Sequence, residues 1–237
     1  MTEWCVFYKE VTTSTNVDAL GGRHGDVFTA GFQTAGKGRL GHKWLSSKGK
    51  NLVMSVVLDV SRVSLEHSVT FPLVCGLATA RALSRFSPDA AVSIKWPNDV
   101  WARGAKIAGI LCERHGDNVT AGIGVNVLER RFPQEIASRA TSLALLTGTP
   151  VSVNDVRDAV LEELSTLYDV WVDRGFEAVY GELSAMDFLK GRKVRVRQRD
   201  DDLAPVEGVC GGILVDGSLD VAGERVYAGE AHVEEMW

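Results

Sequence analysis

Short apolar runs dominate the first 60 positions, and their lengths are those of strands. Residues 5–11 and 27–33 have strand character, and 51–58 form a nearly unbroken apolar run typical of a buried strand. Residues 16–20 can form a short helix, because serine and threonine caps stand directly before them. The predicted order is therefore strand, helix, strand, strand.

Two longer segments carry helical signals. Residues 65–86 are predicted to form a long buried helix, whose apolar stretch is too short to cross a bilayer. A second, amphipathic helix follows Ser152, because apolar side chains recur at spacings of three and four as far as Trp171. Asp155 completes the Ser-x-x-Asp start signal of this helix. Its apolar face must pack on a sheet.

Strand-like runs fill most of the remaining chain. Three of them lie between the two helices and are separated by short turns, at residues 92–96, 107–113 and 119–127. From about residue 189 the pattern changes to short strands punctuated by glycines, with a charged loop at 199–202. We therefore expect a larger domain of helices on a sheet, and a small C-terminal β-barrel docked on it.

Composition excludes several classes of protein. With 45% hydrophobic and 24% charged residues among 237, the chain is an ordinary globular one. Its formal net charge of −5 argues against a nucleic-acid partner held mainly by electrostatics. The first eleven residues lack the features of a signal peptide or anchor, so we expect a cytoplasmic protein without membrane contact. The four cysteines form no C-x-x-C pair, and we expect free, mostly buried thiols.

A glycine-rich stretch, Gly36-Lys-Gly-Arg-Leu-Gly41, has the G-x-G-x-x-G spacing of a dinucleotide site. A turn and a strand follow it, whereas that fold requires a helix there. It also lacks the Ser or Thr that ends a phosphate loop of the G-x-x-x-x-G-K-[ST] type. The stretch and the residues after it contribute Lys37, Arg39, His42 and Lys43 and end at Trp44. This pattern is typical of a flexible, cationic lid over a phosphate, or of a solvated turn.

Three further clusters are candidates for a site. Lys95-Trp-Pro-Asn-Asp99 and Lys106-Ile-Ala-Gly-Ile110 each bring a lysine to the end of a strand. Asn98 and Asp99 can stabilise the turn that Pro97 makes, or Asp99 can hold Mg²⁺ for a nucleotide. In Gly122-Ile-Gly-Val-Asn126, two glycines leave bare backbone on which a planar base or ring can lie beside the Asn126 amide.

Taken in this order, the motifs resemble those of the biotin protein ligases, a family whose catalytic domain shares its ancestry with class II aminoacyl-tRNA synthetases. The resemblance covers nearly the whole chain, from Ser14-Thr-Asn16 through 33–44 and the two lysine clusters to 122–126 and Thr141-Ser-Leu143. It implies an α+β fold, with a mixed sheet and flanking helices over residues 1–186 and a small C-terminal β-barrel over 187–237. Larger members carry an N-terminal helix-turn-helix, whereas here the pattern begins within the first dozen residues, so we expect the short form.

The resemblance also implies roles for individual residues. Those expected to contact biotin are Ser14, Thr15, Asn16, Gln33, Lys37, Gly38, Arg39 and Lys106. Those expected to contact the nucleotide are Lys37, Arg39, Trp44, Lys95, Asn98 and Asn126. Lys106 and Arg39 are the expected catalytic residues, because fixed cations stabilise the charge that develops at the carboxyl and α-phosphate groups. Asp99 is expected to hold Mg²⁺ with ATP.

Three positions depart from the pattern of the family. The chain has Lys37 and His42 where many members have arginine, and neither residue can hold an anion with the planar fork of a guanidinium. Glu234 stands near the C-terminus where arginine is often found, so the chain lacks the cation that other members offer to the nucleotide there.

The activity that the resemblance implies is an ATP-dependent ligase. It would convert biotin to biotinyl-5′-AMP with release of pyrophosphate, and transfer the biotin to a lysine of the biotin carrier domain of a carboxylase. A homodimer is a habit of the family. Two alternatives remain: a lipoate or octanoate ligase on the same fold, and a non-catalytic protein that binds biotin or its adenylate. The loop 33–44 and the Lys95–Asp99 run favour biotin, and the presence of Arg39 and Lys106 favours catalysis.

Overall fold

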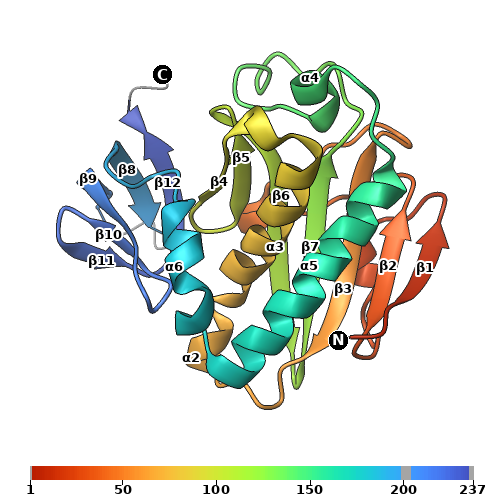
Figure 1. The fold of residues 1–237 in the computed structure, drawn as a ribbon, viewed down its shortest axis with the longest axis horizontal. Helices are drawn as coiled ribbons and strands as arrows, with labels where there is room; N and C mark the ends of the chain where they lie inside the picture. The colour runs from red at the N-terminus through yellow and green to blue at the C-terminus, as the bar shows by residue number, and fades with distance from the viewer. Residues whose placement is uncertain (1, 199–203, 235–237) are drawn as a thin grey trace.

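The computed structural model describes residues 2–198 and 204–234, which form two sheets and a layer of helices (Figure 1). The larger sheet has seven strands in the order β1-β2-β3-β7-β6-β5-β4. Its strands are β1 (Cys5–Lys9), β2 (Asp26–Ala30), β3 (Asn51–Asp59), β4 (Val92–Lys95), β5 (Asp99–Ala102), β6 (Ala105–His115) and β7 (Asn118–Asn126). β1 pairs with β2 in parallel and the other pairs are antiparallel, so the sheet is mixed, as predicted.

The centre of this sheet is formed by β3 and β7. Every residue of β3 except the last is buried, which confirms the buried strand predicted from the apolar run at 51–58. The register pairs Ser55 with Gly122 and Val53 with Gly124. The two glycines of the Gly122–Asn126 motif therefore lie in the middle of the sheet, beside its most apolar strand.

Helices α3 and α5 cover one face of the sheet side by side (Figure 1). The α-helices are α1 (Thr15–Asp18), α2 (Leu65–Ser68), α3 (Phe71–Phe86), α4 (Leu143–Thr147), α5 (Val153–Arg174) and α6 (Glu177–Ala185), and the 3-10 helices are η1 (Arg39–Gly41) and η2 (Pro88–Ala90). Trp171 of α5 packs on Phe71 of α3, with ring centroids 4.8 Å apart. The Ser152 side chain accepts a hydrogen bond from the Asp155 amide, which confirms the predicted start of α5.

The sequence-based prediction differs from the structure in short elements. The single helix predicted over 65–86 is wrong, because α2 and α3 are separate and Pro72 lies in the first turn of α3. Proline has no amide hydrogen to donate, so a helix can begin at it but rarely continues through it. β5 and α6 are not predicted, since β5 has only four residues and directly follows the Trp-Pro-Asn turn.

A smaller antiparallel sheet follows, in the order β11-β10-β9-β8-β12, and confirms the predicted C-terminal β domain. Its strands are β8 (Lys193–Gln198), β9 (Val206–Ile213), β10 (Leu219–Val221), β11 (Glu224–Val226) and β12 (Gly229–Val233). The charged loop predicted at 199–202 lies outside the described residues. The Phe188 amide donates to the Ile94 carbonyl at 2.9 Å, and Trp96 Nε1 donates to the Gly217 carbonyl at 3.0 Å. These bonds fix the smaller sheet to the β4 end of the larger one. The domain boundary at 186/187 stays a prediction.

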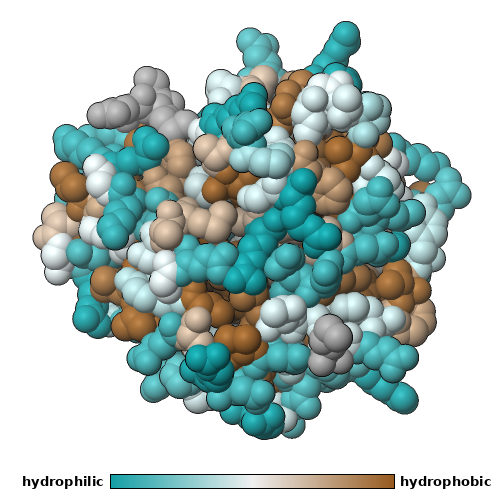
Figure 2. All heavy atoms as spheres, in the orientation of Figure 1, coloured by the Kyte–Doolittle hydropathy of each residue, from teal (hydrophilic) through white to brown (hydrophobic). Residues whose placement is uncertain are grey.

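The surface is that of a globular protein, with hydrophilic residues running over the helices and apolar ones interspersed (Figure 2). Within residues 2–198 and 204–234, no helix is both long and apolar enough to cross a membrane. The four cysteines are free, as predicted. Only Cys75 and Cys210 are fully buried, while Cys5 is exposed, so the expectation of mostly buried thiols holds for half of them.

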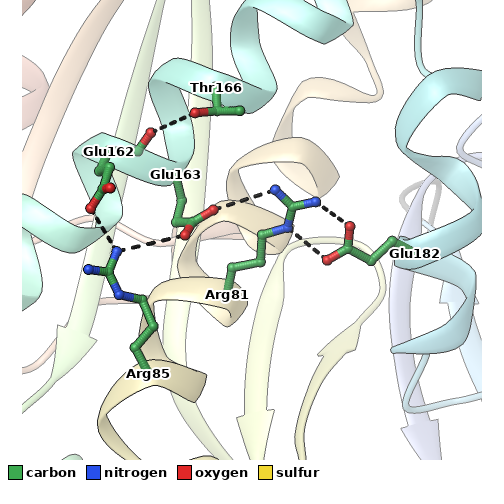
Figure 3. A network of polar contacts seen from close by, with 6 residues as sticks. All are labelled: Arg81, Arg85, Glu162, Glu163, Thr166 and Glu182. Carbon is green, nitrogen blue, oxygen red and sulfur yellow. Dashed lines mark hydrogen bonds and ion pairs between the residues drawn. The ribbon is translucent and has the colours of Figure 1, made fainter.

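Two arginines of α3 connect the three longest helices (Figure 3). The Arg81 guanidinium contacts both carboxylate oxygens of Glu182 on α6, with Nε at 2.7 Å, and reaches Glu163 of α5 at 3.4 Å. Arg85 lies 2.7 Å from Glu162 of α5. Because α6 leads into the smaller sheet, this network helps to hold the two sheets in position.

Arg81→Met keeps most of the apolar stem and removes the guanidinium. We expect the free energy of unfolding at about pH 7 to fall by about 1 kcal/mol, because two carboxylates lose their shared cation. Arg81 lowers the pKa of Glu182, so this contribution is present above the pKa of an unfolded glutamate and is lost as the pH falls through the folded-state pKa. Urea denaturation at neutral and acidic pH measures both effects. Arg85→Met is the control, because Arg85 pairs with glutamates of α5 and Arg81 also reaches α6. An equal loss of unfolding free energy in the two variants would contradict the prediction.

Candidate active site

One cavity of about 420 Å³ opens between the larger sheet, the loop 36–44 and strand β12. All residues that the sequence predicts for the site line it: Ser14, Thr15, Asn16, Gln33, Lys37, Gly38, Arg39, Trp44, Lys95, Asn98, Asp99, Lys106 and Asn126. They come from six separate segments of the chain. The fold therefore brings the predicted site residues together, while their individual roles stay predictions.

One end of the cavity is neutral and polar. Gln33 Oε1 accepts a hydrogen bond from the Thr15 amide at 2.8 Å and lies 3.1 Å from Thr15 Oγ1. The Ser55 hydroxyl lies 2.7 Å from Thr15 Oγ1 and 2.6 Å from Asn16 Oδ1. Asn16 Nδ2 donates to Glu113 Oε2 at 2.6 Å. Sequence reasoning missed Ser55 and Glu113; the signal for Ser55 is its hydroxyl in the middle of an otherwise apolar strand.

Side chains of the protein itself fill the space next to the glycines of β6 and β7. A Cβ atom on Gly122 would lie 2.2 Å from Asn16 Oδ1. A Cβ on Gly124 would lie 2.5 Å from the Trp44 ring, and one on Gly109 would lie 3.1 Å from it. The ring expected on this bare backbone is therefore, in this structure, the indole of Trp44. Its Nε1 is buried and has no hydrogen-bond partner among the described residues.

The loop 36–44, which we call the lid, is folded on itself as a short hairpin. The Gly38 amide donates to the His42 carbonyl at 2.7 Å and the Trp44 amide to the Gly36 carbonyl at 3.0 Å. Leu40 at its tip has a φ of 52°, in the left-handed region. These bonds define the backbone path of the lid.

The lid touches both domains across the mouth of the cavity. Arg39 donates to Asn98 Oδ1 and to the Gly229 carbonyl of β12, each at 3.3 Å. His42 Nε2 lies 3.8 Å from the Glu230 carboxylate. Asn98 also donates to the Ile110 carbonyl at 2.6 Å, so it fixes the turn to β6 while it holds Arg39. Contacts of the lid thus link the larger sheet to β12.

The other end of the cavity is cationic. Lys106 Nζ lies 2.7 Å from Asp99 Oδ1, which holds this lysine at the end of β6. Lys95 Nζ lies 4.5 Å from the centre of the Trp101 ring. Burial lowers the pKa of Lys95; Asp99 opposes this shift and the charge of Lys106 adds to it. A buried ammonium in such a setting gains stability when an anion binds next to it.

The charge of the cavity is opposite to that of the whole chain. Six lysines and arginines line it and only two carboxylates do: Lys37, Arg39, Lys43, Lys95, Lys106 and Arg139 against Asp99 and Glu230. The whole chain has a formal charge of −5. A concave, cationic site in an acidic protein attracts small anions, including polyphosphates, rather than a long nucleic acid. Sequence reasoning missed Arg139, which lies outside every motif it considered, and gave no role to Glu230 and His232, although both lie in the segment that ends at Glu234.

The remaining predicted residues have specific partners. Asn126 is buried and its Nδ2 donates to the Thr141 carbonyl at 3.0 Å, so its Oδ1 is the atom that can accept a hydrogen bond from a base. Glu234 forms an ion pair with Lys193 at 2.7 Å. The Glu234 carboxylate, at a position where the resemblance predicted arginine, is thus paired with a lysine of β8 in the smaller sheet.

The residues around Asp99 fit Mg²⁺ only in a limited way. Within the described residues there is no group of three or more histidine, cysteine, aspartate or glutamate side chains able to hold a metal ion. Mg²⁺ often uses one or two carboxylates and takes its other ligands from phosphates and water. Asp99, which already pairs with Lys106, matches that mode and not a complete protein site.

Comparisons with known sequences agree on one family. Residues 10–128 match the model of the biotin/lipoate A/B protein ligase family. The chain is 32% identical over 235 residues to the biotin–[acetyl-CoA-carboxylase] ligase of Mycobacterium tuberculosis, covering 95% of this chain and 86% of that protein. It is 28% identical to the bifunctional ligase/repressor BirA of Escherichia coli, of which it spans 66% of the length.

Solved structures agree with the sequence comparison. The biotin protein ligase of Aquifex aeolicus in complex with biotin and ATP has a TM-score of 0.85 and 28% identity, covering 97% of this chain and 98% of that one. The biotin protein ligase of Leishmania major in complex with biotin has a TM-score of 0.67 and 27% identity, covering 90% and 92%. The chain therefore belongs to the biotin/lipoate A/B protein ligase family.

Proposed function

We propose that this protein is a biotin protein ligase, which activates biotin with ATP and transfers it to a lysine of a biotin carrier domain. The observation that carries the proposal is a single cavity with a neutral, hydrogen-bonding end at Thr15 and Gln33 and a cationic end at Lys95 and Lys106. Biotin has the same polarity, because its ureido ring is neutral and its carboxylate reacts with a phosphate. The names of the relatives and the ligands of the Aquifex aeolicus structure support this assignment.

In the first step, a carboxylate oxygen of biotin attacks the α-phosphorus of ATP, and pyrophosphate leaves with the electrons of the broken phosphoanhydride bond. Lys106, held by Asp99, supplies a fixed positive charge where the reacting carboxylate and phosphate meet. Arg39 approaches from the lid, and Lys95 faces the phosphates that leave. Asp99 would hold the Mg²⁺ that comes with ATP and neutralises phosphate charge. Positioning and charge neutralisation supply the catalysis.

In the second step, the neutral amine of the acceptor lysine attacks the carbonyl carbon of the adenylate, an amide bond forms and AMP leaves. Water would attack the same carbon, so the lid must exclude it. The contacts of the lid with Gly229 and Glu230 support a closed arrangement in which β12 forms part of the wall. We propose that Trp44 and the Asn126 Oδ1 contact the adenine.

Lipoate or octanoate ligation is the second candidate function, because the matching family model includes lipoate ligases. The dithiolane ring of lipoate and the alkyl chain of octanoate have no N–H group and no carbonyl for Thr15 and Gln33 to bind. Both acids would leave the buried polar groups of that end unpaired, which costs binding free energy. The polar end of the cavity therefore favours biotin. A non-catalytic binder would not require Lys106 beside the phosphates.

Further aspects of the assignment stay predictions: the homodimer, the cytoplasmic location, the absence of a nucleic-acid partner and the identity of the carboxylase that supplies the acceptor. The carboxylase acceptor is supported by the name of the Mycobacterium tuberculosis relative.

Lys106→Met tests the proposed chemistry. We expect the wild-type chain to release pyrophosphate from ATP with biotin, and not with lipoate or octanoate, and to modify a lysine of a biotin carrier domain. The variant should release pyrophosphate roughly a hundredfold more slowly, because the developing charge loses its fixed cation. A coupled pyrophosphate assay and mass spectrometry of the acceptor measure both steps. Lys190→Met, at an exposed position, is the control. Biotin binding without pyrophosphate release in the wild type would favour the binder.

Lys95→Met should separate stability from activity. Burial lowers the pKa of Lys95, so the charged form costs folding free energy and an apolar side chain of similar length removes that cost. We expect the Tm of the ligand-free variant to rise, while pyrophosphate release falls at least tenfold because a cation at the phosphates is lost. Differential scanning calorimetry and the same assay decide this. A lower Tm in this variant would show that its ammonium stabilises the ligand-free fold.

Gly124→Ala tests how closely Trp44 must approach the sheet. The new methyl group would lie 2.5 Å from the indole, so Trp44 has to leave its place. We expect Trp44 fluorescence to shift toward that of a solvated indole and the KM for ATP to rise about tenfold, with little change in Tm. Gly181→Ala on α6, where a Cβ meets nothing within 4 Å, is the matched control. Unchanged ATP kinetics in Gly124→Ala would argue against a role of Trp44 at the nucleotide.

A further inference from the structure

A chain of short hydrogen bonds runs from Glu113, which lies outside the cavity lining, to the neutral end of the cavity. It passes from Glu113 Oε2 to Asn16 Nδ2 at 2.6 Å, and from Asn16 Oδ1 to Ser55 Oγ at 2.6 Å. Ser55 Oγ then lies 2.7 Å from Thr15 Oγ1. The members come from β6, α1 and β3, and Asn16, Ser55 and Thr15 are all buried. Thr15, the last member, lies beside Gln33 in the lining of the cavity.

The direction of every bond in this chain follows from the carboxylate at its end. An ionised carboxylate only accepts hydrogen bonds, so it fixes the amide nitrogen of Asn16 toward itself and the amide oxygen toward Ser55. The single Ser55 proton must then go to Asn16 Oδ1. The short contact between the Ser55 and Thr15 hydroxyls still needs a proton, and only Thr15 can supply it. Gln33 Oε1 competes for that proton over 3.1 Å, and the contact of 2.7 Å with Ser55 is the shorter one.

This direction determines what the cavity offers to a ligand. The Thr15 proton points away from the cavity, so Thr15 Oγ1 presents a lone pair and acts as an acceptor. Gln33 Oε1 accepts from the Thr15 amide at 2.8 Å, so the Gln33 amide nitrogen is the donor that remains. An acceptor and a donor side by side are complementary to an N–H next to a carbonyl, which is the arrangement in a cyclic urea.

The position of Asn16 gives independent support, because this side chain has no room to move aside and can only exchange its amide oxygen and nitrogen by turning over in place. Its Oδ1 occupies the space of a missing side chain at Gly122, only 2.2 Å from where a Cβ would be. The Asn16 amide is thus held between the β7 backbone, Ser55 and Glu113. A change of charge at Glu113 is therefore transmitted through the chain and not absorbed by a shift of Asn16.

We propose that Glu113 is a positioning residue that sets the hydrogen-bond polarity of the pocket, so that the pocket selects a ligand with an N–H beside a carbonyl. The inference rests on the proposed function and deepens it. Glu113 acts through Asn16 and Ser55 on Thr15, without touching the ligand. Without it, Asn16 Nδ2 keeps only its longer contact of 3.5 Å with the Leu111 carbonyl, so the amide can turn over and the Thr15 hydroxyl is free to offer a proton where an acceptor is needed.

The first part of the test removes the carboxylate. Glu113→Leu should raise the Kd for biotin at least tenfold, as the loss of a charge-assisted hydrogen bond implies, and leave the KM for ATP within about twofold. His115→Gln, two residues further along β6 and exposed, is the matched control. Isothermal titration calorimetry gives the Kd, and the pyrophosphate assay gives the KM. Equal losses for biotin and ATP would mean a general structural role and would overturn the inference.

The second part restores the polarity with different atoms. Asn16→Asp alone places two carboxylates against each other and should weaken biotin binding roughly a hundredfold. In the double variant Asn16→Asp, Glu113→Gln, the new amide at position 113 would donate to the new carboxylate at position 16, which would still only accept from Ser55. We expect the double variant to bind biotin at least tenfold more tightly than Asn16→Asp, a coupling that a double-mutant cycle measures. Binding no tighter than in the single variant would overturn the inference.

Titration of the wild-type chain with biotin separates the proposed function from the proposed role of Glu113. If the wild-type chain does not bind biotin, the proposed function fails and this inference fails with it. If the wild type binds biotin and Glu113→Leu binds it equally well, only the inference fails. Recovery of biotin binding in the double variant supports the proposed function and the role of Glu113. Calorimetry gives the Tm of each variant and shows which of them fold.

Discussion

The site depends on how closely side chains from the first 45 residues approach the bare backbone of β7. Asn16 and Trp44 lie where Gly122 and Gly124 would otherwise carry a Cβ atom, and each is far from that strand in the sequence. Because the interior is close-packed, a single methyl group at either glycine would move one end of the cavity. The same two contacts define its neutral end and its lid. The shape of the cavity is therefore set by the sheet and not by the lid alone.

Electrostatics divides the cavity into two halves. The neutral half orients its polar groups through short hydrogen bonds, whereas the other half collects lysines and arginines around only two carboxylates. Burial of Lys95 disfavours its charge in the ligand-free protein, and a phosphate would remove that cost. The ligand-free protein is therefore less stable than it could be at the place where an anion is expected to bind, which is common at functional sites.

The smaller sheet contributes to the site through one strand. β12 places Gly229 and Glu230 against the lid, where Arg39 donates to the Gly229 carbonyl and His42 lies 3.8 Å from the Glu230 carboxylate. The resemblance predicts arginine at positions 37 and 42 in many members, and here the Glu230 carboxylate gives His42 a specific partner. The helical network around Arg81 maintains the position of the smaller sheet. Direct contacts therefore connect the lid to the smaller sheet.

The sequence by itself determined the larger elements and the motif residues. The apolar run at 51–58 and the capped, periodic helix after Ser152 have local physical causes, and both are confirmed. The glycine and lysine motifs indicated the cavity residues, since their spacing and charge are local as well. These features need only neighbours along the chain, so one sequence is enough to predict them.

Tertiary structure alone decided which isolated residues complete the site. Ser55 and Glu113 belong to no motif, and their shared partner Asn16 lies 39 and 97 positions away from them. It also decided that Trp44 occupies the glycine backbone and that β5 is a strand, because only sheet register gives so short a segment its hydrogen bonds. Contacts between residues far apart in sequence leave no periodic pattern. Such contacts are defined only when the chain folds.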